Sequence, residues 1–577
     1  MLSLSRKRWL EPPAEEPAAA ALVAALGVSP VLARLLARRG LQDPDQARFF
    51  LQADTEKLHD PFLMRGMDTA VERLVRAIES GEKFAVYGDY DVDGVTAAAL
   101  MVHFFRELDC PISWYLPDRL EEGYGVNTEG LRRLHAAGHT LVITADCGIT
   151  AVSEVAAARE WGLDVIITDH HQVGPEGLPQ ALAVLNPHQP DCRYPYRFLS
   201  GVGIVFKLAA GVRRRLYEKG WDPARLPNLK QHLDLFALGT IADLAPLTGE
   251  NHVLSVHGLE VMRTSKKPGL VALKNVAGCT GSIDAFAIGF GLGPRLNAAG
   301  RMGKADRGLH LLLAEHPEEA LRLAKELDAV NTERRETQNW VLEEAEYLLE
   351  REVDLDEERV IVLGSKNFHP GVIGIVASKL VEKYHRPTVL IALDNGTGKG
   401  SARSIPAFNL HRALGECAEH LLQFGGHACA AGLTIEAGRV DSLRAALNAV
   451  GRRVLKDEDL VPEIAIDAAL ELGDLDWDFY GEVRRLEPFG PLNPAPVFLT
   501  RGVQAGKRRV IGKDGTHIRF TASSGRARVE VIGFRLAPLF DGLPEEAPLD
   551  IVYQLHRNDF SGPAKLELKL LDARPAL

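Results

Sequence analysis

An apolar run that ends in closely spaced acids constrains this chain most: Phe84-Ala-Val-Tyr-Gly-Asp-Tyr-Asp-Val-Asp-Gly94. The run is typical of a buried strand that breaks at Gly88, after which Asp89, Asp91 and Asp93 occupy alternating positions. Carboxylates held close together raise one another's pKa unless a cation neutralises them. The pattern therefore predicts a strand that leads into a metal-binding acidic loop. A solvated acidic turn without a ligand is the alternative.

The same loop matches the first half of an EF-hand calcium loop. The ninth and twelfth positions of such a loop would be Ala97 and Leu100, so the bidentate glutamate that completes the calcium cage is missing. An EF-hand loop also follows a helix, whereas an apolar strand precedes this one. We therefore exclude an EF-hand.

Composition limits the class of protein. With 577 residues the chain is too long for one core, and about three or four domains are expected. Its 6 cysteines include no Cys-x-x-Cys pair, which disfavours a zinc ribbon or a disulfide framework and favours a reducing cytoplasm. No apolar run approaches the roughly 18 residues of a membrane span, and no signal peptide is recognisable. The net charge of -11 excludes a uniformly basic nucleic-acid binder, so such a partner would need local patches or bound metal ions.

Strand and helix patterns predict a mixed α/β chain in five parts. Apolar strands at 83–87, 140–144 and 164–168 alternate with helical segments, which indicates a mostly parallel sheet with helices on both faces. The middle of the long helix, 331–339, has no apolar stripe, as is typical of a helix that crosses solvent between domains. The parts are an N-terminal helical extension (1–60), the parallel-sheet domain (61–315), a long connecting helix (316–353), a second α/β domain (354–458) and a small antiparallel β-barrel (459–577).

Candidate ligands follow each strand of the parallel-sheet domain. Asp146 follows the second strand, Asp169-His170-His171 follows the third, and Asp243 follows a further apolar run. Functional sites of open α/β sheets lie beyond the carboxyl ends of the strands, so these side chains should converge with the acidic loop. A core histidine with satisfied hydrogen bonds is the alternative for His170 or His171 alone. Their position beside Asp169 at a strand end favours function.

Carboxylates combined with imidazole suit Mn²⁺ or Mg²⁺ better than Ca²⁺, while Zn²⁺ and Fe remain possible on ligand type. The number of candidate ligands favours two ions over one. Two metals about 4 Å apart can hold an attacking hydroxide, polarise a phosphoryl group and stabilise the leaving oxygen. Phosphoester hydrolysis is therefore the reaction that we expect.

These segments carry a resemblance to a known family. Asp-x-Asp-x-Asp-Gly at 89–94, Asp146, Asp169-His-His171 and Asp243 resemble the four motifs of the DHH phosphoesterase superfamily. Gly400-Ser-Ala-Arg-Ser404 and Gly425-Gly-His-Ala-Cys-Ala-Ala-Gly432 resemble its DHHA1 partner domain. From about residue 60 onward the chain is similar to the bacterial single-strand-specific 5′→3′ DNA exonucleases of this superfamily, and the long helix and an OB-like, nucleic-acid-binding terminal barrel fit the same architecture. Four segments carry that similarity: Gly123-Tyr-Gly125, Leu296-Asn-Ala-Ala-Gly-Arg301, His369-Pro-Gly-Val-Ile-Gly374 and Pro488-Phe-Gly490.

The resemblance implies a role for each candidate residue. It implies two divalent ions, Mn²⁺ preferred or Mg²⁺, with Asp89 supporting or completing the first site beside the ligands Asp91, Asp93, Asp146, His170 and Asp243. His171 would face the scissile phosphate, with Asp169 and Arg301 as further catalytic residues. Arg119, Ser401 and Arg403 would line a pocket for a 5′ phosphate. The other implied substrate-binding residues are Tyr124, His369, Gly425, Gly426 and His427.

Local chemistry supports two of these assignments. Gly425-Gly426 lets backbone N–H groups approach an anion closely, and His427 can donate to it, with a tight turn as the alternative. Arg301 and Arg403 carry planar guanidinium groups that suit phosphates, although a single arginine is more often a surface charge.

The predicted barrel carries a basic stretch. Residues 501–530 hold 8 lysines and arginines against Asp514 and Glu530. We expect Lys507, Arg508 and Arg509 to contact phosphates of a single strand. We also expect the rings of Phe520, Tyr553 and Phe560 to stack under its bases. A solvated strand face with core aromatics is the alternative.

The implied function is hydrolysis of single-stranded DNA from its 5′ end to mononucleotides, in DNA repair and recombination in a bacterial cytoplasm. A small-substrate DHH enzyme would need neither barrel nor long helix, and an inactive replication scaffold would be expected to lose metal ligands. The implied partners are single-stranded DNA and, by resemblance only, single-strand-binding protein and a helicase. We expect a monomer without membrane contact. The chain ends directly after the barrel, so a tail found in some relatives is expected to be missing.

Overall fold

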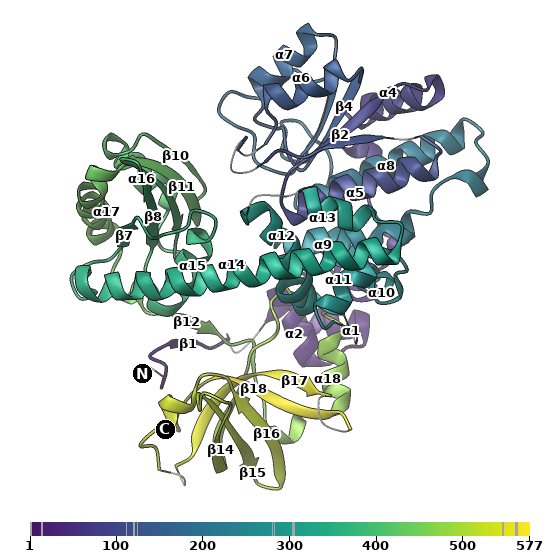
Figure 1. Cartoon of the computed structure of the whole chain (residues 1–577). Helices are drawn as coiled ribbons and strands as arrows, with labels where there is room; N and C mark the ends of the chain where they lie inside the picture. The colour runs from purple at the N-terminus through teal and green to yellow at the C-terminus, as the bar shows by residue number, and fades with distance from the viewer. Residues whose placement is uncertain are drawn as a thin grey trace. The chain divides into compact units, whose positions relative to one another are not determined.

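The computed structural model describes residues 3–12, 16–110, 112–118, 122–123, 125–279, 281, 283–302, 306–544, 547–559 and 563–576 (Figure 1). Arg119, Tyr124 and Phe560 lie outside the described residues. The chain forms two compact units. The first unit contains Ala18–Thr332 and Arg484–Ala495, and the second contains Met1–Pro17, Glu333–Val483 and Pro496–Leu577.

The first unit contains the predicted parallel sheet. All of its neighbouring strands pair in parallel, in the order β3-β2-β4-β5-β6. The strands are β2 (Phe84–Gly88), β3 (Ser113–Tyr115), β4 (Leu141–Ala145), β5 (Asp164–Thr168) and β6 (Ala183–Leu185). The three strands expected from the sequence are therefore present within a residue or two.

Helices cover both faces of this sheet, as the sequence predicts. Successive residues of β2 alternate between two cores, with Val86 packing toward one set of helices and Tyr87 toward the other. The Val86 side includes α4 (Met67–Ser80), α5 (Val92–Glu107), α8 (Gly201–Glu218) and α9 (Leu233–Ala242). The Tyr87 side includes α6 (Thr128–Ala136) and α7 (Val152–Glu160).

The remaining helices of the first unit lie before and after the sheet in sequence. They are α1 (Pro17–Leu26), α2 (Pro30–Arg38), α3 (Pro44–Gln52), α10 (Gly249–Thr264), α11 (Pro268–Val276), α12 (Gly293–Met302) and α13 (Asp306–Leu313). A π-helix, Ala287–Leu292, leads directly into α12. The predicted extension 1–60 is divided between the units, because β1 (Arg8–Leu10) pairs in parallel with β12 (Glu463–Ala465) of the second unit.

The long helix is α14 (Pro317–Glu352), within a residue of the predicted bounds. Its polar middle is not wholly solvent-exposed, which corrects the sequence expectation. Asn331, Arg334 and Gln338 share one helix face and are all less than a tenth exposed. Arg334 donates a 2.6 Å hydrogen bond to Oε1 of Gln338, so polar groups are buried here with a partner on the same helix.

The second α/β domain has a mixed sheet in the order β10-β11-β9-β8-β7, in which only β7 and β8 pair in parallel. Its strands are β7 (Ile361–Ser365), β8 (Thr388–Asp394), β9 (Thr397–Arg403), β10 (Gln423–Gly426) and β11 (Ala430–Glu436). Its helices are α15 (Ile373–Tyr384), α16 (Leu410–Glu416) and α17 (Val440–Val454). The expected strands at 360–363 and 388–392 and the helix after Gly374 are present.

The C-terminal strands close into a five-stranded barrel, because β14 pairs with both β15 and β17. The predicted antiparallel arrangement is wrong for one pair, since β16 and β18 run in parallel. The barrel strands are β14 (Phe498–Ile511), β15 (His517–Ser524), β16 (Ala527–Gly533), β17 (Leu549–Asn558) and β18 (Lys565–Pro575), preceded by β13 (Ala468–Ala469) and α18 (Trp477–Arg484). Among the described residues, no helix combines the length and hydropathy that a membrane crossing requires.

Candidate metal centre and active site

The acidic loop turns from β2 into α5. The backbone N–H of Asp89 donates to the carbonyl oxygen of Ala145 on the neighbouring strand at 3.2 Å. Asp91 caps α5, and its Oδ1 accepts hydrogen bonds from the N–H groups of Asp93 (3.0 Å) and Gly94 (3.1 Å). A Cβ at Gly94 would lie 2.7 Å from the backbone of Asp89, so only glycine allows the loop to fold back this tightly.

Asp93 lies on the first turn of α5 and is fully buried. Its two carboxylate oxygens accept hydrogen bonds from the backbone N–H groups of Gly201 (2.6 Å) and Val202 (2.9 Å), at the start of α8. Helix N-termini favour negative charge. Burial and the neighbouring Asp91 carboxylate nevertheless raise the pKa of Asp93 to about 7. This carboxylate is thus held in place but incompletely neutralised.

His170 faces carboxylates from three other elements. Its Nε2 lies 3.2 Å from Oδ1 of Asp146, which follows β4, 3.8 Å from Oδ2 of Asp243, at the end of α9, and 3.9 Å from Oδ2 of Asp93. Asp146 has a backbone φ of 66°, a strained value for a residue other than glycine, and its N–H donates to the carbonyl oxygen of Thr168. The ends of β4, β5 and α9 therefore converge as the sequence predicts.

The centre has the properties of a metal site. Both oxygens of Asp89, Oδ1 of Asp146 and Nε2 of His170 are buried without a hydrogen-bond partner among the described residues. Among the described residues, three sets of ligand atoms have all their members within 4.8 Å of one another. The first set is Asp89, Asp91 and Asp146, the second is Asp93, His170 and Asp243, and the third is Asp146, His170 and His171.

Electrostatics agree with a bound cation. Burial and neighbouring carboxylates raise the pKa of Asp89, Asp146 and Asp243 well above the usual range. Burial, with a smaller contribution from His171, lowers the pKa of His170 to about 4, which leaves a neutral imidazole available to a metal. Clustered carboxylates with one neutral imidazole suit Mn²⁺ or Mg²⁺, so the residues fit the ions expected from the sequence.

Asp169 and His171 form a hydrogen-bonded pair at the edge of this cluster. Oδ1 of Asp169 lies 2.7 Å from Nδ1 of His171, and Oδ2 accepts a 2.8 Å hydrogen bond from the N–H of Ile149. Burial opposes the ionisation of both groups, but their mutual hydrogen bond outweighs it. As a result the pKa of Asp169 is lowered and that of His171 is raised to about 9. Asp169 therefore fixes the orientation of the His171 ring.

Sequence reasoning assigned no role to three residues that position this centre. The amide of Asn186 donates to the carbonyl oxygen of His171 at 2.9 Å. Oδ1 of Asn297, on α12, accepts a 3.1 Å hydrogen bond from the N–H of Val92 in the acidic loop. Gly201 leaves space for Asp146. Arg301 also lies on α12, one residue after Gly300, where a Cβ would lie 2.9 Å from the carbonyl oxygen of Tyr90.

Two of the predicted phosphate-binding residues of the second unit lie on one strand. Ser401 and Arg403 are on β9, and Nη1 of Arg403 donates to Oγ of Ser401 (3.3 Å) and to the carbonyl oxygen of Ala402 (2.8 Å). A Cβ at Gly374, near the start of α15, would lie 2.9 Å from Oγ of Ser401. These two side chains therefore lie against a helix N-terminus, where anions are favoured.

The glycine-rich segment lies two strands away from Ser401. Gly425 on β10 pairs with Gly432 on β11, which pairs with Ser401 on β9, so the three residues form one row across the sheet. At the usual strand spacing this row is about 10 Å long. Gly425, Gly426 and His427 are exposed. Nδ1 of His369 accepts a hydrogen bond from the N–H of Gly371 at 3.1 Å.

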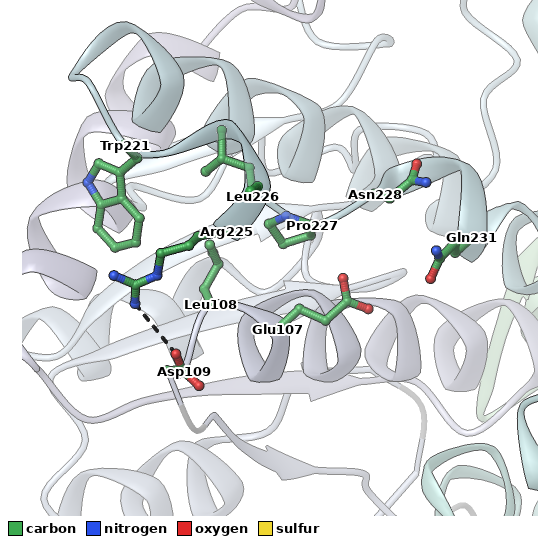
Figure 2. A pocket seen from close by; sticks show the side chains of 10 residues that line it. Glu107, Leu108, Asp109, Trp221, Arg225, Leu226, Pro227, Asn228 and Gln231 are labelled. Atoms are coloured by element: carbon green, nitrogen blue, oxygen red, sulfur yellow. Dashed lines mark ion pairs between the residues drawn. The ribbon is translucent and has the colours of Figure 1, made fainter.

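A cavity of about 370 Å³ in the first unit lies away from the metal centre (Figure 2). It is lined by the C-terminal end of α5 and by residues around Trp221 and Arg225, which pairs with Asp109 at 3.6 Å. The acidic loop caps the opposite end of α5, and the helix's 16 residues correspond to about 24 Å. None of the metal-ligand candidates lines this cavity.

The barrel exposes only part of the predicted strand-binding face. Lys507 and Arg509 are exposed on β14. Arg508 donates to the carbonyl oxygens of Leu543 and Pro544, so its guanidinium also holds a neighbouring loop. The predicted stacking role of Phe520 and Tyr553 is wrong, because strand alternation places both rings in the barrel core, where each is at most 1% exposed.

Known families match three segments of the chain. The DHH family, N-terminal domain, matches residues 83–240, the DHHA1 domain matches 357–452, and the RecJ OB domain matches 466–572. Together with the parallel sheet and its carboxylate–histidine centre, these matches define a phosphoesterase of the DHH class.

Relatives and solved structures narrow this class. The single-stranded-DNA-specific exonuclease RecJ of Bacillus subtilis is 39% identical over 99% of this chain and 71% of that protein. The RecJ of Salmonella typhimurium is 34% identical over 99% of both proteins. The crystal structure of RecJ in complex with Mn²⁺ from Thermus thermophilus matches with a TM-score of 0.84 at 31% identity, over 99% of this chain and 80% of that one. The chain belongs to the RecJ family.

Proposed function

We propose that this protein is a metal-dependent exonuclease that hydrolyses single-stranded DNA from the 5′ end to mononucleotides. One observation carries the proposal: the carboxylates of Asp93, Asp146 and Asp243 converge on the neutral imidazole of His170, in a chain that matches single-stranded-DNA-specific exonucleases over almost its whole length. Structures of the Thermus thermophilus relative in complex with Mn²⁺ and with Mg²⁺ support the same ions here.

The set of Asp89, Asp91 and Asp146 and the set of Asp93, His170 and Asp243 would each hold one divalent ion. Bound ions of this kind lower the pKa of a water molecule, polarise a phosphoryl group and stabilise a leaving oxygen. Asp91 and Asp93 keep fixed orientations because backbone N–H groups of α5 and α8 donate to them. Asp169 fixes the ring of His171 and favours its protonated form, so Nε2 would donate a charge-assisted hydrogen bond to an oxygen of the scissile phosphate.

Ser401 and Arg403 would bind the terminal 5′ phosphate. A guanidinium binds a phosphate dianion through two hydrogen bonds, and the serine hydroxyl and the N-terminus of α15 add further donors. The exposed backbone of Gly425 and Gly426, with His427 and His369, would contact the following phosphates. The strand polarity and the inclusion of Arg119 and Tyr124 follow from the family resemblance.

The 5′-phosphate pocket is testable with Arg403→Ala. Hydrogen bonds to charged groups contribute about 1.5–3 kcal/mol each, so the native protein should degrade a 5′-phosphorylated strand faster than its 5′-hydroxyl counterpart. The substitution should reduce that difference. Shortening of a 5′-blocked strand from its 3′ end at an undiminished rate would contradict both the pocket and the polarity.

The barrel would hold the single strand through Lys507 and Arg509, an assignment that the match to the RecJ OB domain supports. We also propose that the protein acts in DNA repair and recombination, contacts single-strand-binding protein and a helicase, and is a monomer.

A gel assay tests the whole proposal. End-labelled single-stranded DNA, duplex DNA and RNA are incubated with the protein in Mn²⁺ or Mg²⁺. We expect mononucleotides from a 5′-labelled single strand at the earliest times and little product from the duplex. Equal cleavage of duplex and single strand, or a distribution of internal cuts, would contradict a single-strand-specific exonuclease.

A further inference from the structure

Two phenylalanine rings lie stacked on the surface of the first unit. Phe286 and Phe290 are 66% and 74% exposed, with ring centroids 4.6 Å apart and planes 27° from parallel. Single apolar side chains are common on protein surfaces, whereas adjacent exposed rings more often mark a binding site. A ring pair of this kind presents a flat, uncharged face to solvent.

The backbone beneath the rings is firmly held. Phe290 lies within the π-helix and Phe286 directly precedes it, and π-helical turns are frequently found at functional sites. Oδ1 of Asp284 accepts a 2.8 Å hydrogen bond from the N–H of Ala287. Arg295 donates to the carbonyl oxygen of Gly291 (2.6 Å) and to Oδ1 of Asp328 (2.8 Å). The rings are thus presented on a fixed support.

The same helical run reaches the metal centre. A Cβ at Gly293, the first residue of α12, would lie 3.0 Å from Cβ of Ala242, which precedes Asp243. Farther along α12, Asn297 accepts a hydrogen bond from the acidic loop. The seven residues from Phe290 to Asn297 rise about 10 Å along the helix axis. This length corresponds to roughly three nucleotides at the 3.4 Å spacing of stacked bases.

We propose that Phe286 and Phe290 form a stacking platform for bases of the single strand a few nucleotides from the scissile phosphate. The proposal rests on the function proposed above. Bases are the occupant that the geometry favours, because every base has a flat face that stacks on an aromatic ring regardless of sequence. Gly289 borders open space, since among the described residues no atom beyond its chain neighbours and the backbone of its own helix lies within 4 Å of the position that its Cβ would take.

Phe290→Ala tests the platform through the split between KM and kcat. Losing one stacked base contact should raise KM for a strand of about 20 nucleotides roughly tenfold, with a much smaller effect on kcat. Phe290→Trp should restore KM. Phe290→Leu should not restore it, because leucine keeps the apolar surface but lacks a flat π-face. Tyr217→Ala removes another exposed aromatic ring, from α8, and serves as the matched control with an unchanged KM.

The substrate supplies an independent test. A series of strands is prepared in which a single abasic site stands at successive positions near the 5′ end. For the native protein, KM should rise when the site stands at one or two of these positions. For Phe290→Ala, the abasic site should cause little further increase in KM. A flat abasic profile in the native protein, full rescue by leucine, or a loss confined to kcat would overturn the platform. Conversion of a native dimer to a monomer by Phe290→Ala, with KM unchanged, would show a protein interface instead.

Binding without hydrolysis separates this proposal from the proposed function. With metal removed by EDTA, an oligonucleotide carrying 2-aminopurine near its 5′ end should be quenched on binding to the native protein and less so with Phe290→Leu. Quenching without any nuclease activity in Mn²⁺ would sustain the platform and contradict the exonuclease. Nuclease activity in Mn²⁺ without a difference in quenching between the native protein and Phe290→Leu would contradict the platform and sustain the exonuclease.

Discussion

The carboxylate of Asp93 accepts a 2.6 Å hydrogen bond from the backbone N–H of Gly201, the first residue of α8. This contact joins two segments 108 residues apart and attaches a predicted metal ligand to the start of a helix. Gly201 also borders Asp146, because a Cβ at this position would lie 2.4 Å from Oδ1 of Asp146. A single glycine therefore sets the orientation of one ligand and the space for another.

Gly201→Ala should weaken both metal binding and hydrolysis. The added methyl group must displace Asp146, and disturbing the support of a metal ligand typically costs about 10- to 100-fold in affinity or activity. Isothermal titration with Mn²⁺ measures the affinity. Gly203→Ala, on the same helix turn, is the control, because the nearest atoms would be 3.3 Å away. Equal Mn²⁺ affinity for the two variants would show that Asp146 tolerates the displacement.

Asp89→Asn should leave the metal-free protein equally stable or more stable. Both oxygens of Asp89 are buried without a hydrogen-bond partner among the described residues, and burial with the Asp91 charge raises its pKa. Ionised Asp89 therefore opposes folding when no cation is present. Thermal unfolding in EDTA checks the first part, and the stabilisation by added Mn²⁺ should be smaller for the variant. A clear drop in Tm in EDTA would show that Asp89 has a structural role.

His252→Phe should reduce the sensitivity of folding to acid. His252 on α10 stacks on Phe50 with ring centroids 3.6 Å apart, and burial lowers its pKa to about 3. A histidine with an ordinary pKa of about 6.5 in the unfolded chain gains a proton there first, so stability is present above that pH and is lost as the pH falls. Between pH 7 and pH 5 this residue alone should cost about 2 kcal/mol.

Urea unfolding at the two pH values, in EDTA, measures this effect. The native protein should lose about 2 kcal/mol more than the variant on going from pH 7 to pH 5, since contributions from other groups cancel in the comparison. Equal losses for both proteins would mean that His252 is already accessible to protons in the folded state.

Lys507→Glu with Arg509→Glu should flatten the salt dependence of strand binding. Each phosphate contact to a single strand contributes about 0.7 to the slope of log K against log salt, so removing two contacts should lower the slope by about 1.4. Hydrolysis of a very short strand should persist, because the chemistry belongs to the metal centre. Deletion of the barrel from about residue 460 should weaken long-strand binding further. An unchanged slope would place the strand on another surface.

Arg508→Ala should lower the thermal stability of the protein more than Lys507→Ala does. Its guanidinium donates to the carbonyl oxygens of Leu543 and Pro544, so its loss should lower the Tm of the protein. Lys507→Ala, which removes an exposed side chain, provides the comparison. The same small effect on Tm for both would show that the contact to the 543–544 loop is unimportant.

The parallel sheet could be predicted because its apolar strands alternate with helical segments along the sequence. Most of the metal centre could be predicted because Asp89, Asp146 and His170 each closely follow a strand. Parallel strands end at one edge, so residues after them had to meet. The residues that hold the metal ligands in place could not be predicted in this way. Asn297 and Gly201 act through hydrogen bonds or space shared with residues more than 50 positions away, and no local pattern records such contacts.

The barrel, too, could be predicted only in part from the sequence. Its strands were expected from their alternation and turns, but the parallel pairing of β16 with β18 depends on how the sheet closes. Phe520 and Tyr553 were expected under DNA bases because they lie on strands near the basic stretch. Which side of each strand faces inward is set by closure of the barrel, and both rings lie inside it.

Hydrolysis of a 5′-phosphorylated single strand by Asp146→Asn, followed over a Mn²⁺ titration, tests the central claim most directly. Asp146 belongs both to the ligand set of Asp89 and Asp91 and to a set with His170, from which it lies 3.2 Å away, so its carboxylate should be needed for both ions. We predict that the native protein becomes active as Mn²⁺ rises, whereas the variant stays at least about a thousandfold slower at every concentration and remains folded. Activity near that of the native protein in Asp146→Asn would contradict the assignment of this centre as the site of hydrolysis.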